Sequence, residues 1–491
     1  MYLKQLVSFK TNLHLHNPHL NIKGVTTDSR KVKKDFLFAA LSGSKTDGNL
    51  YIHDALNRGA SAIITRPQSD IEIPPHIEKI EDPNPHKLFS QIAAYFYNER
   101  PEFIVGITGT NGKTSTADFI RQLWAHKHIE SGSVGTLGVI TNHHYEYGSL
   151  TTPSPEDLYK ILQDLKLQNI THVALEASSH GLHQYRLDGL LFKAAGFTNL
   201  TRDHLDYHKD MASYQEAKAR LFKDLLEENA PAVLNIDDPA FDYFKNICQK
   251  NKRTVITYGK HATDIQLIDQ KLTAQGQQLS LKIFDQKIDT FFPVAGNFQI
   301  YNLLCALGLV IGTGTKVADA LSAIPTLKSV PGRIELVGQL NNQASIYIDY
   351  AHTPDALETI LKALRPHTDK QLIVVFGCGG NRDRGKRPQM GSIADRLADK
   401  VIVTDDNPRH ENPNHIRKEI LAACKKGIEI ANREQAIYKA INMLHSQDIL
   451  VIAGKGHETG QIVGNTVHPF DDKVIANQAI LEKNKGNINV T

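Results

Sequence analysis

The sequence predicts a multidomain α/β protein built on parallel sheets. At 491 residues the chain is long enough for about three domains. Short apolar runs rich in β-formers alternate with helical stretches and end in polar residues, as at His172–Glu176, Ala194–Asn199 and Lys400–Thr404. Buried strands of parallel sheets have this continuous apolar character, and ligands gather where such strands end. We therefore expect functional side chains at the carboxyl ends of the strands.

Two proline-containing stretches divide the chain. The first, Glu81–His86, is polar, and the second lies at Pro325–Arg333. Prolines in such polar stretches mark loops between folded segments. We predict domains at residues 1–88, 89–328 and 329–491, of which the second and third carry the alternating pattern of strands and helices.

The composition argues against polyanionic and membrane partners. Lys and Arg number 56 against 53 Asp and Glu, so no charge excess favours nucleic acid or a membrane surface. The four cysteines lie far apart, without the spacing of a zinc site or a disulfide framework. No apolar run reaches the length of a membrane span. We expect a soluble, cytoplasmic monomer that binds neither nucleic acid nor membrane.

A glycine-rich turn is the most informative motif. The apolar run Phe103–Val105 leads into Gly106-Ile107-Thr108-Gly109-Thr110-Asn111-Gly112-Lys113-Thr114, and a helical pattern follows. The glycines let backbone N–H groups converge on a polyphosphate, Lys113 adds positive charge, and the Thr114 hydroxyl can join Mg²⁺. Five residues rather than four separate Gly106 from Gly112, so the turn is a variant of the P-loop pattern. A turn without a ligand is the alternative interpretation.

Two polar segments that follow strands supply candidate metal ligands. Glu176 ends the run His172–Glu176, and a carboxylate there could hold a Mg²⁺ ion that bridges the phosphates of ATP. The stretch Asn199–His208 is dense in His and Asp, which bind metals and transfer protons. A solvated glutamate at a strand end is the alternative for Glu176 taken alone.

Together these motifs resemble the Mur ligases, ATP-dependent enzymes that form amide bonds in peptidoglycan synthesis. The matching pieces, in family order, are Gly109–Thr114, Glu176–Leu182, Thr201–His208 and Asp349–Pro354. The resemblance implies three domains: an N-terminal domain that binds a UDP-sugar, a central P-loop ATPase domain with a parallel sheet, and a C-terminal Rossmann-like domain that brings the amino acid.

The resemblance also implies the residues of each site. The ATP contacts would be Gly109, Thr110, Asn111, Gly112, Lys113, Thr114, Ser115, Asn302, Arg333, Asp349 and His352. The catalytic groups would be Lys113, Glu176, His204 and Lys218, and the Mg²⁺ ligands Thr114, Glu176, His204 and Lys218. The contacts to the UDP-sugar and its peptide would be Ser29, Ser44, Lys45, Thr46, Thr151, Thr152, Ser178, Gln184 and Arg186.

Lys218 matches a lysine that the family carries as a carbamate. An ammonium would repel Mg²⁺, whereas addition of CO₂ makes the side chain an anionic oxygen ligand. Without the resemblance Lys218 reads as an exposed residue of a helix. Two positions depart from the family pattern. The family usually has Asn at the position of Gln299 and often has Asn at the position of Leu150. Contacts of these two residues are therefore in doubt.

The last segment indicates which amino acid is used. Asp406-Asn407-Pro408-Arg409 resembles the signature of family members that add meso-diaminopimelate to UDP-N-acetylmuramoyl-L-alanyl-D-glutamate, and lysine-adding relatives lack the arginine. A guanidinium can bind the second carboxylate of meso-diaminopimelate, which lysine lacks, through two parallel hydrogen bonds. The resemblance adds Arg382, Gly454 and Glu458 to the amino-acid site.

The implied reaction is a two-step acyl transfer. ATP phosphorylates the γ-carboxylate of the D-glutamyl residue, and the amine of meso-diaminopimelate then displaces phosphate. A lysine-adding ligase of the same family is the nearest alternative. A folylpolyglutamate synthetase-like ligase is a second one, although it would not need a uridine-binding domain. The third, a non-catalytic nucleotide-binding protein, would not need the intact set of catalytic groups.

Overall fold

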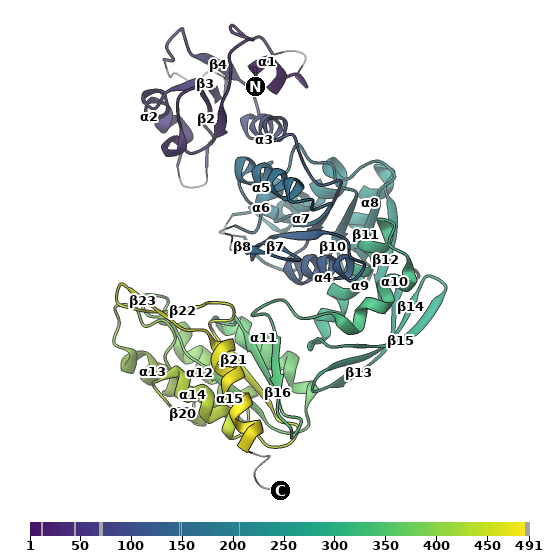
Figure 1. Cartoon of the computed structure of the whole chain (residues 1–491), viewed down its shortest axis with the longest axis vertical. Coiled ribbons are helices and arrows are strands. Elements are labelled where there is room, and N and C mark those ends of the chain that lie inside the picture. The colour runs from purple at the N-terminus through teal and green to yellow at the C-terminus, as the bar shows by residue number, and fades with distance from the viewer. Residues whose placement is uncertain are drawn as a thin grey trace. The chain divides into compact units, whose positions relative to one another are not determined.

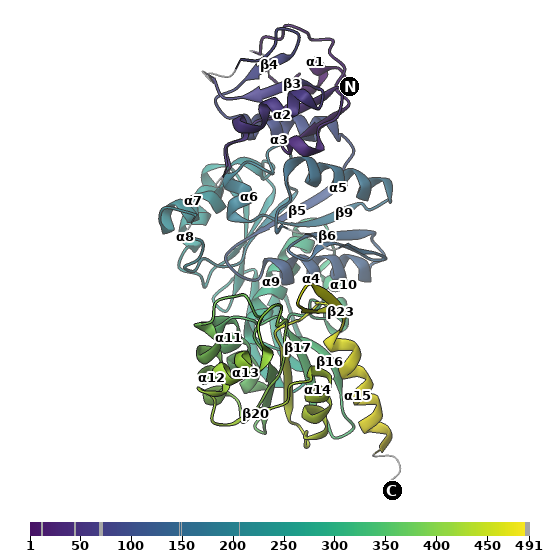
Figure 2. The same cartoon turned by 90° about the vertical axis from the view of Figure 1, so that its left-hand side faces the viewer.

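The computed structural model describes residues 1–10, 13–43, 46–67, 72–146, 148, 150–205 and 207–486. The chain divides into two units, the first formed by Met1–Ile265 with Asn302–Ala320 and the second by Gln266–Tyr301 with Leu321–Thr491. Each unit contains a mainly parallel sheet flanked by helices, which confirms the predicted α/β class (Figures 1 and 2). The domain boundaries near residues 88 and 328 remain predictions.

A small sheet with the strand order β1-β2-β3-β4 begins the first unit. Its strands are parallel, and neighbouring residues of β2 enter different cores, Leu37 on one face and Phe38 on the other. The bounds are α1 (Leu3–Leu6), β1 (Gly24–Thr26), η1 (Ser29–Lys31), β2 (Phe36–Ala39), η2 (Gly48–Tyr51), α2 (Ile52–Asn57), β3 (Ala60–Thr65), β4 (Glu78–Glu81) and α3 (Pro85–Phe96).

The part of the central sheet that lies in the first unit has the order β12-β11-β10-β5-β9-β6-β7-β8. Its strands are β5 (Phe103–Thr108), β6 (Ser131–Gly135), β7 (Gly138–Thr141), β8 (Tyr145–Glu146), β9 (His172–Glu176), β10 (Ala194–Phe197), β11 (Pro231–Asn235) and β12 (Thr254–Gly259). β5 pairs in parallel with β9 and β10, so Ile107 lies beside Glu176 and Thr108 beside Phe197. The sequence motifs that follow these three strands therefore meet at one edge.

Helices lie on both sides of this sheet, with α5 on one side and α4 on the other in both views (Figures 1 and 2). The helical bounds are α4 (Lys113–His126), α5 (Pro155–Leu167), α6 (Ser179–His183), α7 (Met211–Arg220), the π-helical turn η3 (Leu221–Leu225) and α8 (Phe241–Lys250). α9 (Asn297–Gly312) and α10 (Val317–Ala323) contain residues of both units. None of the helices in the described ranges is long and apolar enough to cross a bilayer.

The second unit contains a sheet with the order β16-β17-β21-β18-β19-β20, parallel except for the β16–β17 pair. Its strands are β16 (Glu335–Gln339), β17 (Ser345–Asp349), β18 (Leu372–Phe376), β19 (Lys400–Val403), β20 (Gly427–Glu429) and β21 (Ile449–Ala453). The other strands are β13 (Ile265–Thr273), β14 (Gly276–Ile283), β15 (Gln286–Phe292), β22 (Gly460–Val463) and β23 (Thr466–Pro469).

Alternate residues of β17 enter two cores on opposite faces of this sheet. Tyr347 packs with residues of α11, α12 and α13, whereas Ile346 and Ile348 pack with residues of α14 and α15. The helical bounds are η4 (Ile324–Thr326), α11 (Pro354–Leu364), η5 (Arg365–His367), α12 (Lys386–Leu397), α13 (Pro413–Leu421), α14 (Arg433–Asn442) and α15 (Asp472–Gly486). Both faces of the sheet are thus covered, as its continuous apolar strands predict.

Candidate functional site

The glycine-rich turn joins β5 to α4, as the sequence predicts. Gly109 and Gly112 have positive φ angles of 148° and 86°. A Cβ on Gly109 would lie 1.9 Å from Thr198 Oγ1, and one on Gly112 would lie 2.2 Å from Asn302 Oδ1. Both positions therefore need glycine for conformation and for space. The same contact brings the predicted nucleotide residue Asn302 to the turn.

Lys113 folds back onto the turn that precedes it. Its ammonium donates to Gly109 O at 3.0 Å and to Thr110 O at 2.8 Å. Burial lowers the pKa of this ammonium. The turn is braced by Asn111, whose N–H donates to Asn199 Oδ1 at 3.0 Å, while Ser115 is buried in the first turn of α4. The predicted phosphate-binding residues thus form one continuous loop.

Glu176 reaches this loop from the end of β9. The Thr114 hydroxyl donates to Glu176 Oε2 at 3.1 Å, and the Thr136 N–H donates to Oε1 at 2.9 Å. Burial raises the pKa of the carboxyl. The contact brings together a hydroxyl and a carboxylate, the oxygen ligands that Mg²⁺ prefers. Thr136 is a residue that sequence reasoning missed, and no sequence pattern around it indicates the contact.

Lys218 is buried, with 1% of its surface exposed, whereas the sequence alone indicated an exposed helical residue. α7 directs it inward, where its Nζ donates to Gly109 O at 2.7 Å and lies 4.3 Å from the centroid of the Tyr214 ring. Burial, and then the charge of Lys113, holds its pKa well below the usual value. Sequence reasoning missed Tyr214, although its spacing of one helical turn from Lys218 could have indicated the contact.

The histidines after β10 form a second cluster. His204 is exposed, and its ring centroid lies 4.8 Å from that of His180. His208 is buried, and its pKa falls to about 4, chiefly because of burial and then because of the charges of His180 and His183. The described residues contain no group of three or more His, Cys, Asp or Glu side chains that could hold a metal ion. The metal set that includes a modified Lys218 therefore stays a prediction.

A cavity of about 240 Å³ joins most of these groups to the predicted peptide contacts. Its lining residues are Lys113, Leu150, Thr151, Thr152, Ser178, Ser179, His180, Arg186, His204, Tyr214 and Lys218. Thr152 Oγ1 lies 2.9 Å from Ser178 Oγ, and Arg186 donates to Thr152 O and to Gln184 Oε1, each at 2.6 Å. Leu150, a departure from the family pattern, supplies an apolar wall in place of an amide.

The predicted uridine contacts lie in the small N-terminal sheet region. Ser29 is buried at the start of η1, and Thr46 is exposed. Ser44 and Lys45 fall outside the described residues. The Thr27 N–H and hydroxyl donate to Glu156 Oε1 at 2.9 and 2.6 Å, which ties the loop before Ser29 to α5.

A larger cavity of about 550 Å³ lies in the second unit. Its lining residues are Tyr350, His352, Thr353, Pro354, Asp355, Gly379, Arg382, Asp383, Lys386, Gln389, Asp406, Asn407, Arg409, Gly454 and Glu458. Except for the buried Pro408, every residue predicted for the amino-acid site lines it. Arg409 donates to Gly380 O at 3.0 Å, and a Cβ on Gly454 would lie 2.8 Å from Asp406 Oδ2.

Three further predicted nucleotide residues lie near one another in the second unit. Asp349 accepts from the N–H groups of Ile334 and Ala351 at 2.8 and 2.7 Å, and burial raises its pKa to about 6. The Arg333 guanidinium lies 5.3 Å from the Tyr350 ring centroid, and Tyr350 O lies 2.8 Å from Nδ1 of His352. Gln299 is buried, so this departure from the family pattern sits inside the fold.

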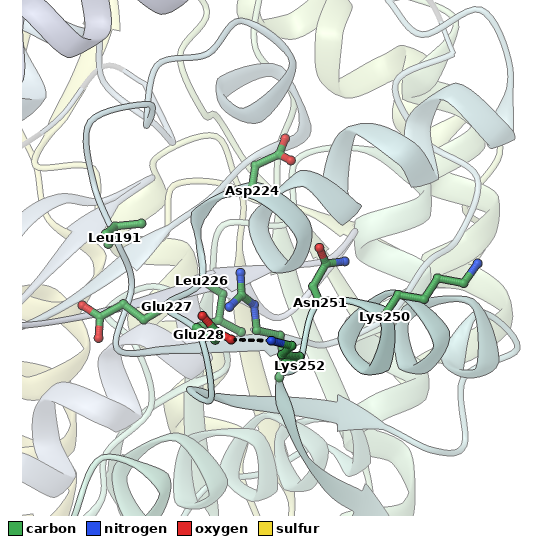
Figure 3. A pocket seen from close by; sticks show the side chains of 9 residues that line it. Leu191, Asp224, Leu226, Glu227, Glu228, Lys250, Asn251 and Lys252 are labelled. Carbon is green, nitrogen blue, oxygen red and sulfur yellow. Dashed lines mark hydrogen bonds and ion pairs between the residues drawn. The ribbon is translucent and has the colours of Figure 1, made fainter. Parts of the chain in front are cut away.

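Another hollow of about 390 Å³ lies in the first unit and contains none of the predicted site residues (Figure 3). Its charged side chains are of both signs, and Lys252 forms an ion pair with Glu228 at 3.2 Å. Glu227 pairs with Lys193 at 2.7 Å. Because its charges neutralise one another, this hollow does not resemble an anion site.

Comparison with family models matches three parts of the chain. Residues 21–97 match the model described as Mur ligase family, catalytic domain, residues 107–310 match the Mur ligase middle domain, and residues 332–456 match the Mur ligase, glutamate ligase domain. A solved structure of a UDP-N-acetylmuramoyl-L-alanyl-D-glutamate--2,6-diaminopimelate ligase matches with a TM-score of 0.76 and 32% identity, covering 98% of this chain and 99% of that one. A folylpolyglutamate synthase from Mycobacterium tuberculosis, complexed with ADP and AMPPCP, matches at 17% identity with a TM-score of 0.53, covering 74% of this chain and 90% of that one, and shows the fold alone.

Curated relatives are more similar. The UDP-N-acetylmuramoyl-L-alanyl-D-glutamate--2,6-diaminopimelate ligase of Rhizobium meliloti (strain 1021) is 47% identical, and the match covers 94% of each chain. The protein of the same name from Brucella melitensis biotype 1 is 45% identical over 96% of each chain. Such identity over nearly the whole length, together with the three matching models, shows that the chain belongs to the Mur ligase family.

Proposed function

We propose that this protein is an ATP-dependent ligase that joins meso-diaminopimelate to the D-glutamyl γ-carboxylate of UDP-N-acetylmuramoyl-L-alanyl-D-glutamate. The observation that carries the proposal is the cavity of the second unit, where Arg382 and Arg409 share one space with Asp406 and Glu458. Groups of both charges suit a zwitterion, and a further guanidinium suits a ligand with a second carboxylate. The names of the curated relatives agree with this choice.

The proposed chemistry has two steps. An oxygen of the γ-carboxylate attacks the γ-phosphorus of ATP, ADP leaves, and an acyl phosphate forms. Lys113, released from the loop carbonyls, would offset the charge on the transferred phosphoryl group. The amino nitrogen of meso-diaminopimelate then attacks the acyl carbon and loses a proton, and the tetrahedral intermediate expels phosphate.

Mg²⁺ fits the oxygen atoms that converge beside the glycine-rich turn. Thr114 and Glu176 already touch through their oxygens, and both would hold the ion. Bound there, Mg²⁺ would neutralise charge on the phosphates. His204 and Lys218 line the cavity that also contains Lys113, which is consistent with a role for both in a further metal site.

A carbamate on Lys218 is part of the proposal. Because burial lowers its pKa, a larger fraction of this amine is neutral than in a solvated lysine, and only a neutral amine attacks the carbon of CO₂ and loses a proton to give a carbamate. Its oxygens would be metal ligands where an ammonium would repel the ion. Protein equilibrated with ¹³C-bicarbonate should show a carbamate ¹³C resonance that is absent from Lys218→Met.

The test of the function is ATP turnover measured against combinations of substrates. We expect ADP release to require both the UDP-linked dipeptide and meso-diaminopimelate, with L-lysine a poor replacement. Equal use of L-lysine would favour the lysine-adding alternative. Turnover with a folate and glutamate, without the UDP-linked dipeptide, would contradict the proposal in favour of the folylpolyglutamate synthetase-like alternative.

A further inference from the structure

Lys455 is a fully buried cation beside the amino-acid cavity, and the resemblance assigns it no role. None of its surface is exposed. Its ammonium donates to Asn407 Oδ1 and to Glu458 Oε2, each at 3.2 Å, and to Gly460 O. One buried group therefore contacts the loop that carries Arg409, the residue at the acidic end of the cavity, and the first residue of β22.

Asn407 is committed to the same network. Besides Lys455, its Oδ1 accepts from the Ile462 N–H at 2.9 Å, and its Nδ2 donates to Glu458 Oε2 at 3.0 Å. The amide oxygen is thus fixed toward Lys455 and β22, while the amide nitrogen is fixed toward Glu458. Both donors to Glu458 converge on Oε2, and within the described residues Oε1 accepts no hydrogen bond.

The hairpin formed by β22 and β23 also contacts other residues of the loop that contains Asp406 and Arg409. Gln461 Nε2 donates to Asp406 O at 2.7 Å, and the Arg409 N–H donates to Ile462 O at 3.0 Å. The Gly464 N–H donates to Arg409 O at 2.7 Å. Arg409 has a φ of 50°, which is costly for a residue with a Cβ and persists only where the surroundings impose it. The hairpin supplies that constraint.

We propose that Lys455 is a positioning residue that fixes the spacing between the two ends of the amino-acid pocket. It holds Glu458, which suits the ammonium end of a ligand, and through Asn407 and β22 it holds Arg409, which suits the distal carboxylate. The length of the accepted amino acid then depends on a group that need not touch it. This inference rests on the proposed function, because it concerns which amino acid that pocket accepts.

The experiment compares two amino acids that differ in length. Wild type and Lys455→Met are assayed with meso-diaminopimelate and with 2,5-diaminoadipate, which is one methylene shorter. Discrimination of one methylene is commonly about 10–200-fold. We expect Lys455→Met to raise the KM for meso-diaminopimelate about tenfold or more. It should also reduce the discrimination between the two amino acids about tenfold, because even a small displacement of the residues that contact a substrate lowers the reaction rate strongly. The KM values for ATP and the UDP-linked dipeptide should change by less than about twofold.

Lys483→Met is the matched control. Lys483 lies in the same unit and also donates to three oxygens, those of Ile441, Asn442 and Leu444. Its removal should lower stability without changing the discrimination. If the discrimination between meso-diaminopimelate and 2,5-diaminoadipate is the same in Lys455→Met as in Lys483→Met, the proposal is overturned. If Lys455→Met does not fold, Lys455→Gln decides: its shorter, uncharged side chain replaces the ammonium that holds Asn407, Glu458 and Gly460, and an unchanged discrimination between the two amino acids there would also overturn the proposal.

Hydrogen exchange separates this inference from the proposed function. Without any substrate, the amides of Arg409 and Ile462 should exchange faster in Lys455→Met than in wild type, and should be unchanged in Lys483→Met. If wild type prefers L-lysine, the proposed function fails, yet faster exchange still supports the positioning role. Unchanged exchange at both amides refutes that role whichever amino acid is used.

Discussion

Two lysines that line the cavity of the first unit have different partners from three fully buried cations that lie near the cavity of the second unit without lining it. In the first unit, Lys113 and Lys218 donate to backbone carbonyls, and within the described residues neither forms an ion pair. In the second unit, the fully buried Arg387, Arg433 and Lys455 each contact at least one carboxylate. The pKa of both lysines in the first unit is lowered by burial.

The difference follows from the ligands that each cavity would receive. A polyphosphate brings several negative charges, so a site built for it leaves its cations without carboxylate partners. A zwitterion brings both charges, and a pocket for it can be neutralised by its own side chains. Substitutions in the first unit should therefore affect activity more than stability, whereas those at buried pairs in the second should affect stability first.

The largest expected effect is that of Lys113→Ala on activity. If Lys113 offsets charge on the transferred phosphoryl group, as proposed, its removal should lower kcat about 10³-fold. The midpoint of thermal unfolding should stay the same or rise, because a desolvated ammonium is lost. The control is Lys127→Ala, at the exposed end of α4, where the pair with Asp319 contributes little. Activity near wild type in folded Lys113→Ala would break the comparison.

A buried pair in the second unit supplies the opposite case. The side chains of Arg433 and Asp472 are fully buried, and Nη2 of Arg433 lies 2.6 Å from Oδ2 of Asp472. Arg433→Met leaves Asp472 uncompensated and should lower the free energy of unfolding by about 3–5 kcal/mol. Chemical denaturation measures this change, with Arg396→Met in the exposed pair with Glu358 as control. Equal stability of the two variants would show that burial does not distinguish these pairs.

Much of the fold could be predicted from the sequence, because the buried strands of a parallel sheet must be continuously apolar. The run at 172–176 becomes β9 with the same bounds, and the runs at 194–199 and 400–404 become β10 and β19, which end at Phe197 and Val403. The antiparallel β14 and β15 were not predicted, because their partly exposed surfaces break the apolar run with polar residues. Their pairing depends on register rather than on composition.

The polar interior was harder to predict. Lysine is almost always solvated, so the sequence alone placed Lys218 at the surface and gave no reason to expect Lys455 in the interior, whereas both are buried. The partners of Lys455 come from a loop 48 residues away and from a hairpin after it. Glycine and arginine motifs indicated which residues line the cavities, but the network that holds them depends on contacts distant in sequence.

Arg409→Ala sharpens the comparison at the ligand itself. Without the guanidinium, the distal carboxylate of meso-diaminopimelate lacks a partner, at a cost of about 2–5 kcal/mol. The KM for meso-diaminopimelate should rise about 100-fold, while the KM values for ATP and the UDP-linked dipeptide change little. L-Lysine loses nothing comparable, so the preference between the two amino acids should shrink. An unchanged preference would remove Arg409 from the specificity site.

The smallest effect is the pH dependence of stability that Lys218 contributes. Its folded pKa is lowered, so between that pKa and about 10.5 the unfolded state binds a proton that the folded state does not. Stability therefore rises with pH in this window, by at most about 1.4 kcal/mol per pH unit for one group. Lys218→Met should lack this contribution.

Urea denaturation measures the difference in the free energy of unfolding between wild type and Lys218→Met. It is carried out in CO₂-depleted buffer at several pH values between neutral and mildly alkaline. The difference should shift in favour of wild type as pH rises above the lowered pKa, because the unfolded state then binds a proton that the folded state does not. Lys223→Met provides the control, since Lys223 is exposed on the turn after α7 and its removal should give a difference that does not vary with pH. A constant difference for Lys218→Met as well would mean that the buried amine stays charged. The contrast between uncompensated lysines in the first unit and paired cations in the second would then fail at Lys218.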